Sequence, residues 1–182
     1  MNIVVFFSGT GTNLQSILQN EEKLNYKVIS TFTNNPDARG IDISKNFNVD
    51  CKILDHKKFD CREKFDEEIN IYLQKLNPDY VILAGYMRIL SNFLVEKWKQ
   101  KIINIHPSLL PKYPGLNTHE RALLAGDKLH GTTIHYVTSD LDAGPIIRQQ
   151  SIEIEPDDTI ESLTEKIKKL ENKIYPETIS NL

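Results

Sequence analysis

Short apolar runs that alternate with helix-like patterns are the feature that most constrains the fold of this 182-residue chain. Residues 3–7 and 80–84 are almost continuously apolar, as strands buried on both faces of a sheet are. Strands that alternate with helices predict parallel strands joined by crossover helices. The expected strands are residues 3–7, 27–32, 51–54, 80–84 and 102–105, and the expected helices begin near Thr12 and after Pro36 or cover residues 62–76 and 91–98.

The last third of the chain departs from this alternation. Residues 132–138 and 146–154 are extended runs with no helix between them, which predicts an antiparallel pairing at the edge of the sheet. A final helix over about residues 159–173 follows the helix-start sequence Pro-Asp-Asp-Thr. We therefore expect an α/β fold, a mainly parallel, doubly wound, Rossmann-like sheet with an antiparallel edge strand near the C-terminus, in a single domain over residues 1–182.

Composition argues against several classes of partner. The net charge is −3, the isoelectric point is about 6.0, and Lys and Arg are dispersed, whereas nucleic-acid binding draws on a basic face. No apolar run approaches the roughly 18 residues of a membrane span, and residues 1–7 lack the basic start of a signal peptide. Cys51 and Cys61 alone fit neither a disulfide framework nor a zinc ribbon. We expect a cytoplasmic protein without a nucleic-acid or membrane partner.

Two polar residues at the end of a predicted strand carry the strongest functional signal. Asn104 and His106 share one face of the strand because side chains alternate, and Pro107 ends the hydrogen-bond ladder. The amide and the imidazole thus lie at the carboxyl end of a strand, where open α/β sheets bind ligands. Asp142, in a loop bounded by Gly144 and Pro145, is available to orient or charge the imidazole. Such a trio can stabilise an oxyanion and move a proton, as acyl transfer between nitrogens requires.

A glycine-containing turn, Gly9-Thr10-Gly11-Thr12-Asn13, joins the first strand to the first helix. Main-chain N–H groups and the helix dipole favour an anion there, which predicts a phosphate site. Leu14 stands where a dinucleotide-binding sequence has its third glycine, and no Gly-Lys-Ser/Thr follows. The structural alternative is a tight turn that needs glycine only for its conformation.

The histidines allow other interpretations. A lone His106 would more often be a buried core residue, and a metal site could use His106, His119, His130, His135 and Asp142. The metal site is the weaker hypothesis, since His130 and His135 are five apart on an expected turn and strand and no second short ligand pair exists. His135 either faces the cleft or packs in the core, and His119, at an expected helix start, either supports the site from a second layer or lies on the surface. We expect no metal.

Four segments together resemble the glycinamide ribonucleotide formyltransferases, a branch of the formyl-folate-dependent transferase family. They are Asn-Ile-His-Pro-Ser-Leu-Leu-Pro at 104–111, Leu-Asp-Ala-Gly-Pro at 141–145, Leu-Ala-Gly-Tyr-Met-Arg-Ile-Leu at 83–90 and Ser-Gly-Thr-Gly-Thr-Asn-Leu at 8–14. The first two are shared across that family, so they indicate the reaction. The other two single out the enzymes of purine synthesis, and the resemblance extends over residues 1 to about 176.

The resemblance implies a reaction and its participants. The formyl group of 10-formyltetrahydrofolate, the co-substrate, would pass by direct attack to the primary amine of glycinamide ribonucleotide. Asn104 and protonated His106 would hold the oxyanion with support from Asp142, without a metal or a covalent nucleophile. The partners would be these small molecules, and the chain a monomer or weak homodimer.

The resemblance also implies binding residues. The nucleotide would lie against Gly11, Thr12, Asn13, Lys168 and Glu171, with Thr12 replacing the usual serine and keeping its hydroxyl. His119 and His135 would lie in a second layer. The folate would lie against Arg62, Met87, Arg88, Ile89, Leu90, Thr138, Ser139, Asp140, Leu141 and Asp142.

Three alternatives remain open at this stage. Methionyl-tRNA formyltransferase would be expected to carry a basic carboxyl-terminal domain, and formyltetrahydrofolate hydrolase an amino-terminal regulatory domain. Residues 1–182 include neither, although many family members run somewhat beyond the final helix. A non-enzymatic folate-binding module would be expected to have lost part of the Asn104, His106 and Asp142 trio, which is intact. The glycinamide ribonucleotide reaction is the favoured expectation.

Overall fold

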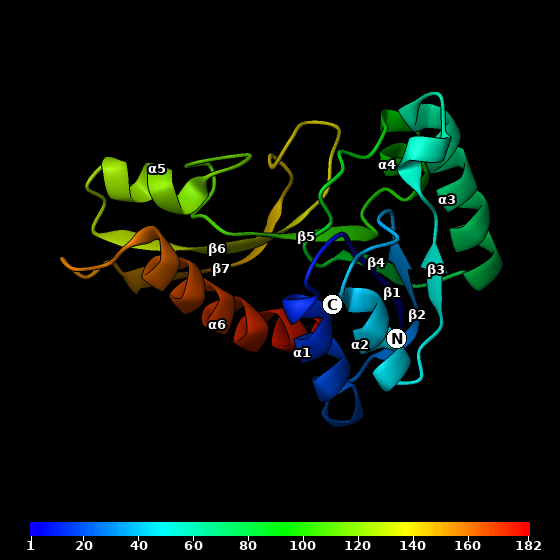
Figure 1. Ribbon diagram of the computed structural model, residues 1–182, viewed down its shortest axis with the longest axis horizontal. Coiled ribbons are helices and arrows are strands. Elements are labelled where there is room, and N and C mark those ends of the chain that lie inside the picture. The colour runs from blue at the N-terminus through cyan, green and yellow to red at the C-terminus, as the bar shows by residue number, and fades with distance from the viewer.

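Seven strands form one sheet, in the order β3-β2-β1-β4-β5-β6-β7, in the computed structural model, which describes residues 1–182 (Figure 1). The strands are β1 (Asn2–Phe7), β2 (Lys27–Thr33), β3 (Cys51–Ile53), β4 (Tyr80–Leu83), β5 (Ile102–His106), β6 (Leu129–Tyr136) and β7 (Ile146–Glu153). The first five pair in parallel, and β6 pairs antiparallel with both β5 and β7. The expected fold class is confirmed. The strand that runs against the others is β6, one position in from the edge.

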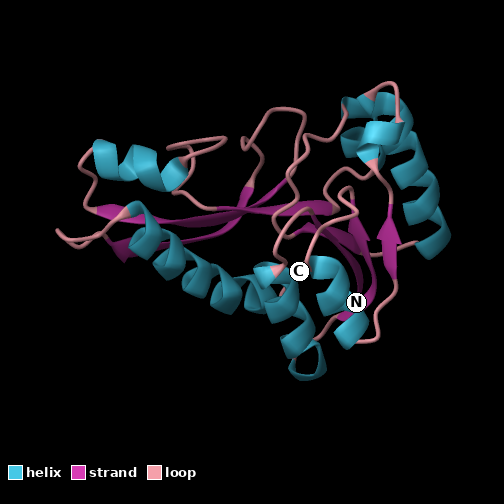
Figure 2. Ribbon diagram, in the orientation of Figure 1, coloured by secondary structure: helices cyan, strands magenta, loops and turns pink.

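Helices cover both faces of the sheet. They are α1 (Thr12–Asn20), α2 (Gly40–Asn46), α3 (Arg62–Leu76), α4 (Asn92–Lys97), α5 (Thr118–Leu124) and α6 (Ile160–Ile179), with short 3-10 turns at Glu21–Lys23 and His56–Lys58. In Figure 2, α1, α2 and α6 lie below the sheet, α4 lies above its right end, and α3 runs down beside that end. None of these helices combines the length and the apolar composition that crossing a bilayer requires.

Alternate residues of β1 enter two separate cores. Ile3 and Val5 pack with α1 and α6 on one face, and Val4 and Phe6 pack with α3 and α4 on the other. All four side chains are fully buried. This two-sided burial explains why the first strand is apolar throughout instead of alternating with polar residues.

The helix expected after Pro36 begins at Gly40, since a turn joining Ala38 N to Asn35 O precedes it. Two other expected boundaries were wrong because of tertiary contacts. β6 begins at Leu129 and ends at Tyr136, because its pairing with β7 begins at Leu129; His130 therefore lies in a strand, not in a turn. The last helix continues to Ile179 because its final turns are buried against the sheet.

Candidate active site

A cleft of about 860 Å³ opens at the carboxyl ends of β1, β4 and β5. The sheet order reverses between β1 and β4, so the loops that follow these strands diverge and leave a crevice between them. Loops after β5 and β6 complete the walls, and Figure 2 shows long loops (pink) rising above the middle of the sheet. The cleft is large enough for a sizeable small-molecule ligand.

Four side chains meet in series at the base of the cleft. The Asn104 amide nitrogen lies 3.3 Å from His135 Nε2. His135 Nε2 lies 3.7 Å from one Asp142 oxygen, and the other Asp142 oxygen lies 3.4 Å from His106 Nδ1. Residues 104 and 135 are direct partners across β5 and β6, which explains their contact. The structure therefore brings Asn104, His106 and Asp142 together and adds His135 between them.

Main-chain carbonyls fix the hydrogen positions on both histidines. His106 Nε2 lies 2.9 Å from the Tyr113 carbonyl oxygen, and His135 Nδ1 lies 2.9 Å from the Tyr136 carbonyl oxygen. A carbonyl oxygen only accepts, so each of these nitrogens donates. His135 Nε2 is left to accept from Asn104, and burial lowers the pKa of His135, which favours this neutral form. The second N–H of the Asn104 amide has no protein partner.

The Asp142 carboxylate is held in place by the loop after β5 and by its own backbone conformation. One of its oxygens accepts a hydrogen bond of 2.8 Å from Gly115 N–H. The backbone of Asp142 has φ of +52°, in the left-handed region that few non-glycine residues adopt. Its side chain is nearly buried between the two imidazoles. This conformation turns the carboxylate toward His106 instead of toward solvent.

The glycine turn after β1 leaves N–H groups free at the start of α1. Gly11 precedes the helix with φ of +76°, and no side chain caps the first turn. A Cβ at Gly11 would lie 2.9 Å from Gly40 Cα and 3.0 Å from Ile43 Cδ1, so conformation and space both require glycine. The turn therefore needs glycine structurally and also exposes donors that suit an anion.

A buried carboxylate on α6 joins this turn to the base of the cleft. One oxygen of Glu171 accepts from the Asn13 amide at 3.0 Å, and the other accepts from the Thr132 hydroxyl at 3.3 Å. Burial raises the pKa of Glu171. Lys168 also lines the cleft from α6 and is exposed. The predicted nucleotide residues thus come together from α1 and α6.

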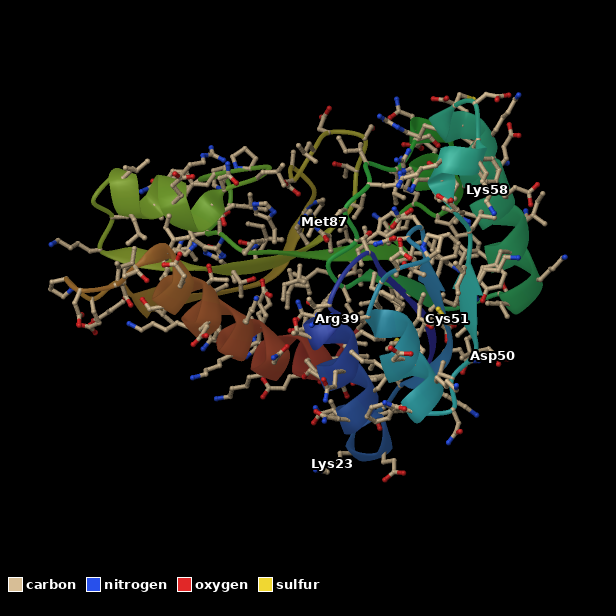
Figure 3. The ribbon with its side chains drawn as sticks, in the orientation of Figure 1. Lys23, Arg39, Asp50, Cys51, Lys58 and Met87 are labelled. Atoms are coloured by element: carbon tan, nitrogen blue, oxygen red, sulfur yellow. The ribbon has the colours of Figure 1, made fainter.

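The opposite end of the cleft has an apolar rim. Met87, Ile89 and Leu141 are 72%, 55% and 55% exposed, and all three line the cleft; Figure 3 labels Met87 near the centre of the view. The Ser8 hydroxyl accepts from Met87 N–H at 2.8 Å, which ties this turn to the end of β1. The Arg88 guanidinium lies over the Phe65 ring at 5.5 Å. Exposed apolar side chains around a cleft are typical of a ligand-binding surface.

Nearly all the predicted site residues line this one cleft. The exception is Arg62, which is exposed at the beginning of α3 and does not line it. The predicted residues that do line the cleft are Gly11, Thr12, Asn13, Met87, Arg88, Ile89, Leu90, Asn104, His106, His119, His135, Thr138, Ser139, Asp140, Leu141, Asp142, Lys168 and Glu171.

His119 is paired with a buried histidine behind the cleft. Its Nδ1 lies 3.0 Å from His130 Nε2. Burial lowers the pKa of His119, and burial together with His119 lowers the pKa of His130 to about 4. No group of three or more His, Cys, Asp or Glu side chains is arranged to hold a metal ion.

Three contacts of the site were not predicted from the sequence. The contact of His106 with the Tyr113 carbonyl cannot be predicted from residue type, because every residue has a main-chain carbonyl. The Thr132 hydroxyl that binds Glu171 looks in the sequence like an ordinary strand residue. The contact of Asn104 with His135 could have been found from the β5–β6 register, had the register been known.

Comparisons with known proteins agree with this geometry. A family model described as formyl transferase matches residues 1–179. Phosphoribosylglycinamide formyltransferase of Escherichia coli (strain K12) is 42% identical over 182 residues, 99% of this chain and 86% of that protein. The Homo sapiens trifunctional purine biosynthetic protein adenosine-3 is 39% identical over 176 residues, 96% of this chain and 17% of that protein. The chain belongs to the formyl transferase family.

Solved structures show the same fold. The phosphoribosylglycinamide formyltransferase from Coxiella burnetii has a TM-score of 0.95 and 44% sequence identity, and the match covers 99% of this chain and 85% of that one. The phosphoribosylglycinamide formyltransferase from Brucella melitensis has a TM-score of 0.94 and 35% identity, with 99% and 94% covered.

Proposed function

We propose that this chain transfers the formyl group of 10-formyltetrahydrofolate to the primary amine of glycinamide ribonucleotide, a step of purine biosynthesis. The observation that carries the proposal is the meeting of Asn104, His106 and Asp142 in one cleft. On one side of the trio lies a turn with free N–H groups, and on the other an apolar rim. Relatives named for this activity align with almost the whole chain.

The reaction develops negative charge on the formyl oxygen. The substrate amine attacks the formyl carbon, and the carbonyl π electrons move to that oxygen. The free N–H of Asn104 and Nδ1–H of His106 donate to the resulting oxyanion, and Asp142, 3.4 Å from Nδ1, stabilises the imidazolium. The intermediate then releases the folate nitrogen. A water carries the proton lost by the amine to that nitrogen, so protons and charge balance without a metal.

The two substrates occupy opposite ends of the cleft. The nucleotide phosphate accepts from N–H groups at Gly11, Thr12 and Asn13, and Glu171 and Lys168 contact the ribose and phosphate region. The folate lies against the turn formed by residues 87–90 and the loop formed by residues 138–142. Arg88 lines this wall, and its guanidinium binds the tail carboxylates.

An acceptor assay tests the proposed reaction. The protein is supplied with 10-formyltetrahydrofolate and either glycinamide ribonucleotide, tRNA or no acceptor, and formylated product and free tetrahydrofolate are both measured. Formyl transfer to glycinamide ribonucleotide alone is the expected result. Formylated tRNA would point to the tRNA-directed reaction, and tetrahydrofolate release that needs no acceptor would point to the hydrolase.

The division of the cleft has its own test. Gly11→Val, which obstructs the turn, should raise KM for the nucleotide far more than KM for the folate, and Arg88→Ala should do the reverse. Free phosphate or sulfate should compete with the nucleotide and not with the folate. Equal effects of both substitutions on both substrates, in variants shown to be folded by circular dichroism, would contradict this division.

A further inference from the structure

We propose that Tyr113 is a positioning residue for formyl transfer. Its main-chain carbonyl keeps a hydrogen on His106 Nε2, so Nδ1 is the nitrogen left to face Asp142 and to donate to the oxyanion. The assignment deepens the proposed function and rests on it for its catalytic meaning. The hydrogen position itself is a property of the free protein.

The Tyr113 carbonyl engages His106 Nε2, so only Nδ1 of that imidazole can change its protonation. The contact from Nε2 to the Tyr113 oxygen is 2.9 Å, and a carbonyl has lone pairs but no hydrogen to give. Nε2 therefore donates in both the neutral and the charged imidazole. Nδ1 faces Asp142 at 3.4 Å, on the cleft side. The change in protonation is thereby confined to the nitrogen that lies beside the carboxylate.

The backbone at Tyr113 is held in an uncommon conformation that aims this carbonyl. Its φ is +57°, in the left-handed region, which a large side chain adopts only where the surroundings enforce it. The buried Ser108 hydroxyl donates to the Lys112 carbonyl at 2.7 Å and approaches the Tyr113 carbonyl at 3.3 Å. Ser108 thus anchors the peptide that contacts His106, and its hydroxyl hydrogen is already engaged.

The Tyr113 ring is anchored from outside the cleft. Its hydroxyl donates to Asp127 at 2.9 Å, and the Lys112 ammonium group lies 3.0 Å from each Asp127 oxygen. The Arg121 guanidinium lies 5.1 Å from the ring centroid. Lys112, Tyr113 and Asp127 border a second hollow of about 310 Å³, which shares no lining residue with the main cleft. The Asp127 carboxylate therefore supports His106 through Tyr113 without contacting substrate.

Nitrogen-15 NMR of the histidine-labelled full chain tests the assignment directly. His106 is assigned with a His106→Asn variant, and both ring nitrogens are followed across pH in the absence of substrates. The expected result is that Nε2 keeps the chemical shift of a protonated nitrogen throughout while Nδ1 alone titrates. A neutral His106 with its hydrogen on Nδ1 would overturn the proposal. Because no substrate is present, failure of the acceptor assay would leave this result unaffected.

Variants of the anchor test the role of Tyr113. Two substitutions weaken the hydrogen bond between the Tyr113 hydroxyl and the Asp127 carboxylate. Tyr113→Phe removes the donor, and Asp127→Asn replaces the charged acceptor with a neutral amide. Both should yield mixed His106 tautomers and lower kcat about tenfold, with KM for both substrates nearly unchanged. Tyr80→Phe is the matched control, because it removes a tyrosine hydroxyl at the amino end of β4, away from the cleft. It should leave the His106 spectrum unchanged. A wild-type His106 spectrum in both anchor variants would refute the positioning role.

Discussion

Single residues in the cleft are oriented by hydrogen bonds to their neighbours. The Asn104 amide gives one N–H to His135 Nε2, and this nitrogen can accept because the other ring nitrogen donates to the Tyr136 carbonyl. The amide is thereby fixed with its remaining N–H available for the formyl oxygen. A donor held in advance costs no reorganisation when charge develops, which is how such groups lower a barrier.

His135→Leu should therefore lower kcat about tenfold, because the Asn104 amide loses its acceptor and no longer holds one orientation. KM for both substrates should change much less. His135→Gln places a carbonyl oxygen near the position of Nε2 and should recover part of the lost rate. Steady-state kinetics of the two variants check this expectation, and a wild-type kcat in the leucine variant would exclude the orienting role.

Among the elements, α6 connects two of the strands that end at the cleft, β4 and β5. Tyr175 is fully buried, and its hydroxyl lies 3.0 Å from the Leu83 carbonyl oxygen on β4 and 3.2 Å from the Ile103 carbonyl oxygen on β5. Glu171 lies one turn earlier on the same helix and contacts the turn at the start of α1. The helix thus fixes the sheet and one substrate region together.

Tyr175→Phe should reduce the free energy of unfolding by about 1–2 kcal/mol, because the buried carbonyls of Leu83 and Ile103 lose the hydroxyl that donates to them. Urea unfolding monitored by circular dichroism measures the change, with Tyr80→Phe as a control, since that partly exposed tyrosine has no hydrogen bond from its hydroxyl. Equal stability of Tyr175→Phe and the wild type would show that the hydroxyl contacts contribute nothing.

The helices and strands were largely predictable, because their buried positions carry apolar residues in patterns that the sequence shows. The predicted bounds of the Arg62–Leu76 helix agree with the structure, and the apolar runs at β1 and β4 are recognisable without any tertiary information. The end of α6 was not predictable, because it depends on contacts such as the one from the Tyr175 hydroxyl to the Leu83 carbonyl, which is far away in the sequence. Within the site, residues with distinctive side chains were found, whereas the Tyr113 carbonyl could not be.

At the scale of the whole molecule, two buried ionisable groups, His130 and Glu171, make the stability of the fold depend on pH in opposite directions. His130 is 1% exposed with its pKa lowered to about 4, and Glu171 is buried with its pKa raised. A lowered pKa means that the unfolded chain binds the proton more tightly than the folded chain. The contribution of His130 is therefore present above about pH 6.5 and is lost as the pH falls toward 4, while Glu171 acts in the other direction.

Substitution of His130 should expose this dependence. The wild type should lose about 2 kcal/mol more stability than His130→Gln when the pH falls from 7 to 5, because the glutamine cannot take up a proton. The difference between the two proteins isolates His130, since Glu171 is common to both. Urea unfolding at the two pH values provides the comparison. Parallel losses in the two proteins would mean that His130 does not titrate as its burial indicates.

The rate of formyl transfer within the bound complex tests the central claim most directly. Single-turnover kinetics with both substrates saturating are compared for the wild type and for Asn104→Ala, His106→Ala and Asp142→Ala, with the dissociation constant of each substrate measured separately. Each variant should transfer the formyl group at least about 100-fold more slowly while binding both substrates nearly as well, because these groups act on charge that develops only in the transition state. A near-normal rate in any one variant would contradict the role assigned to that residue.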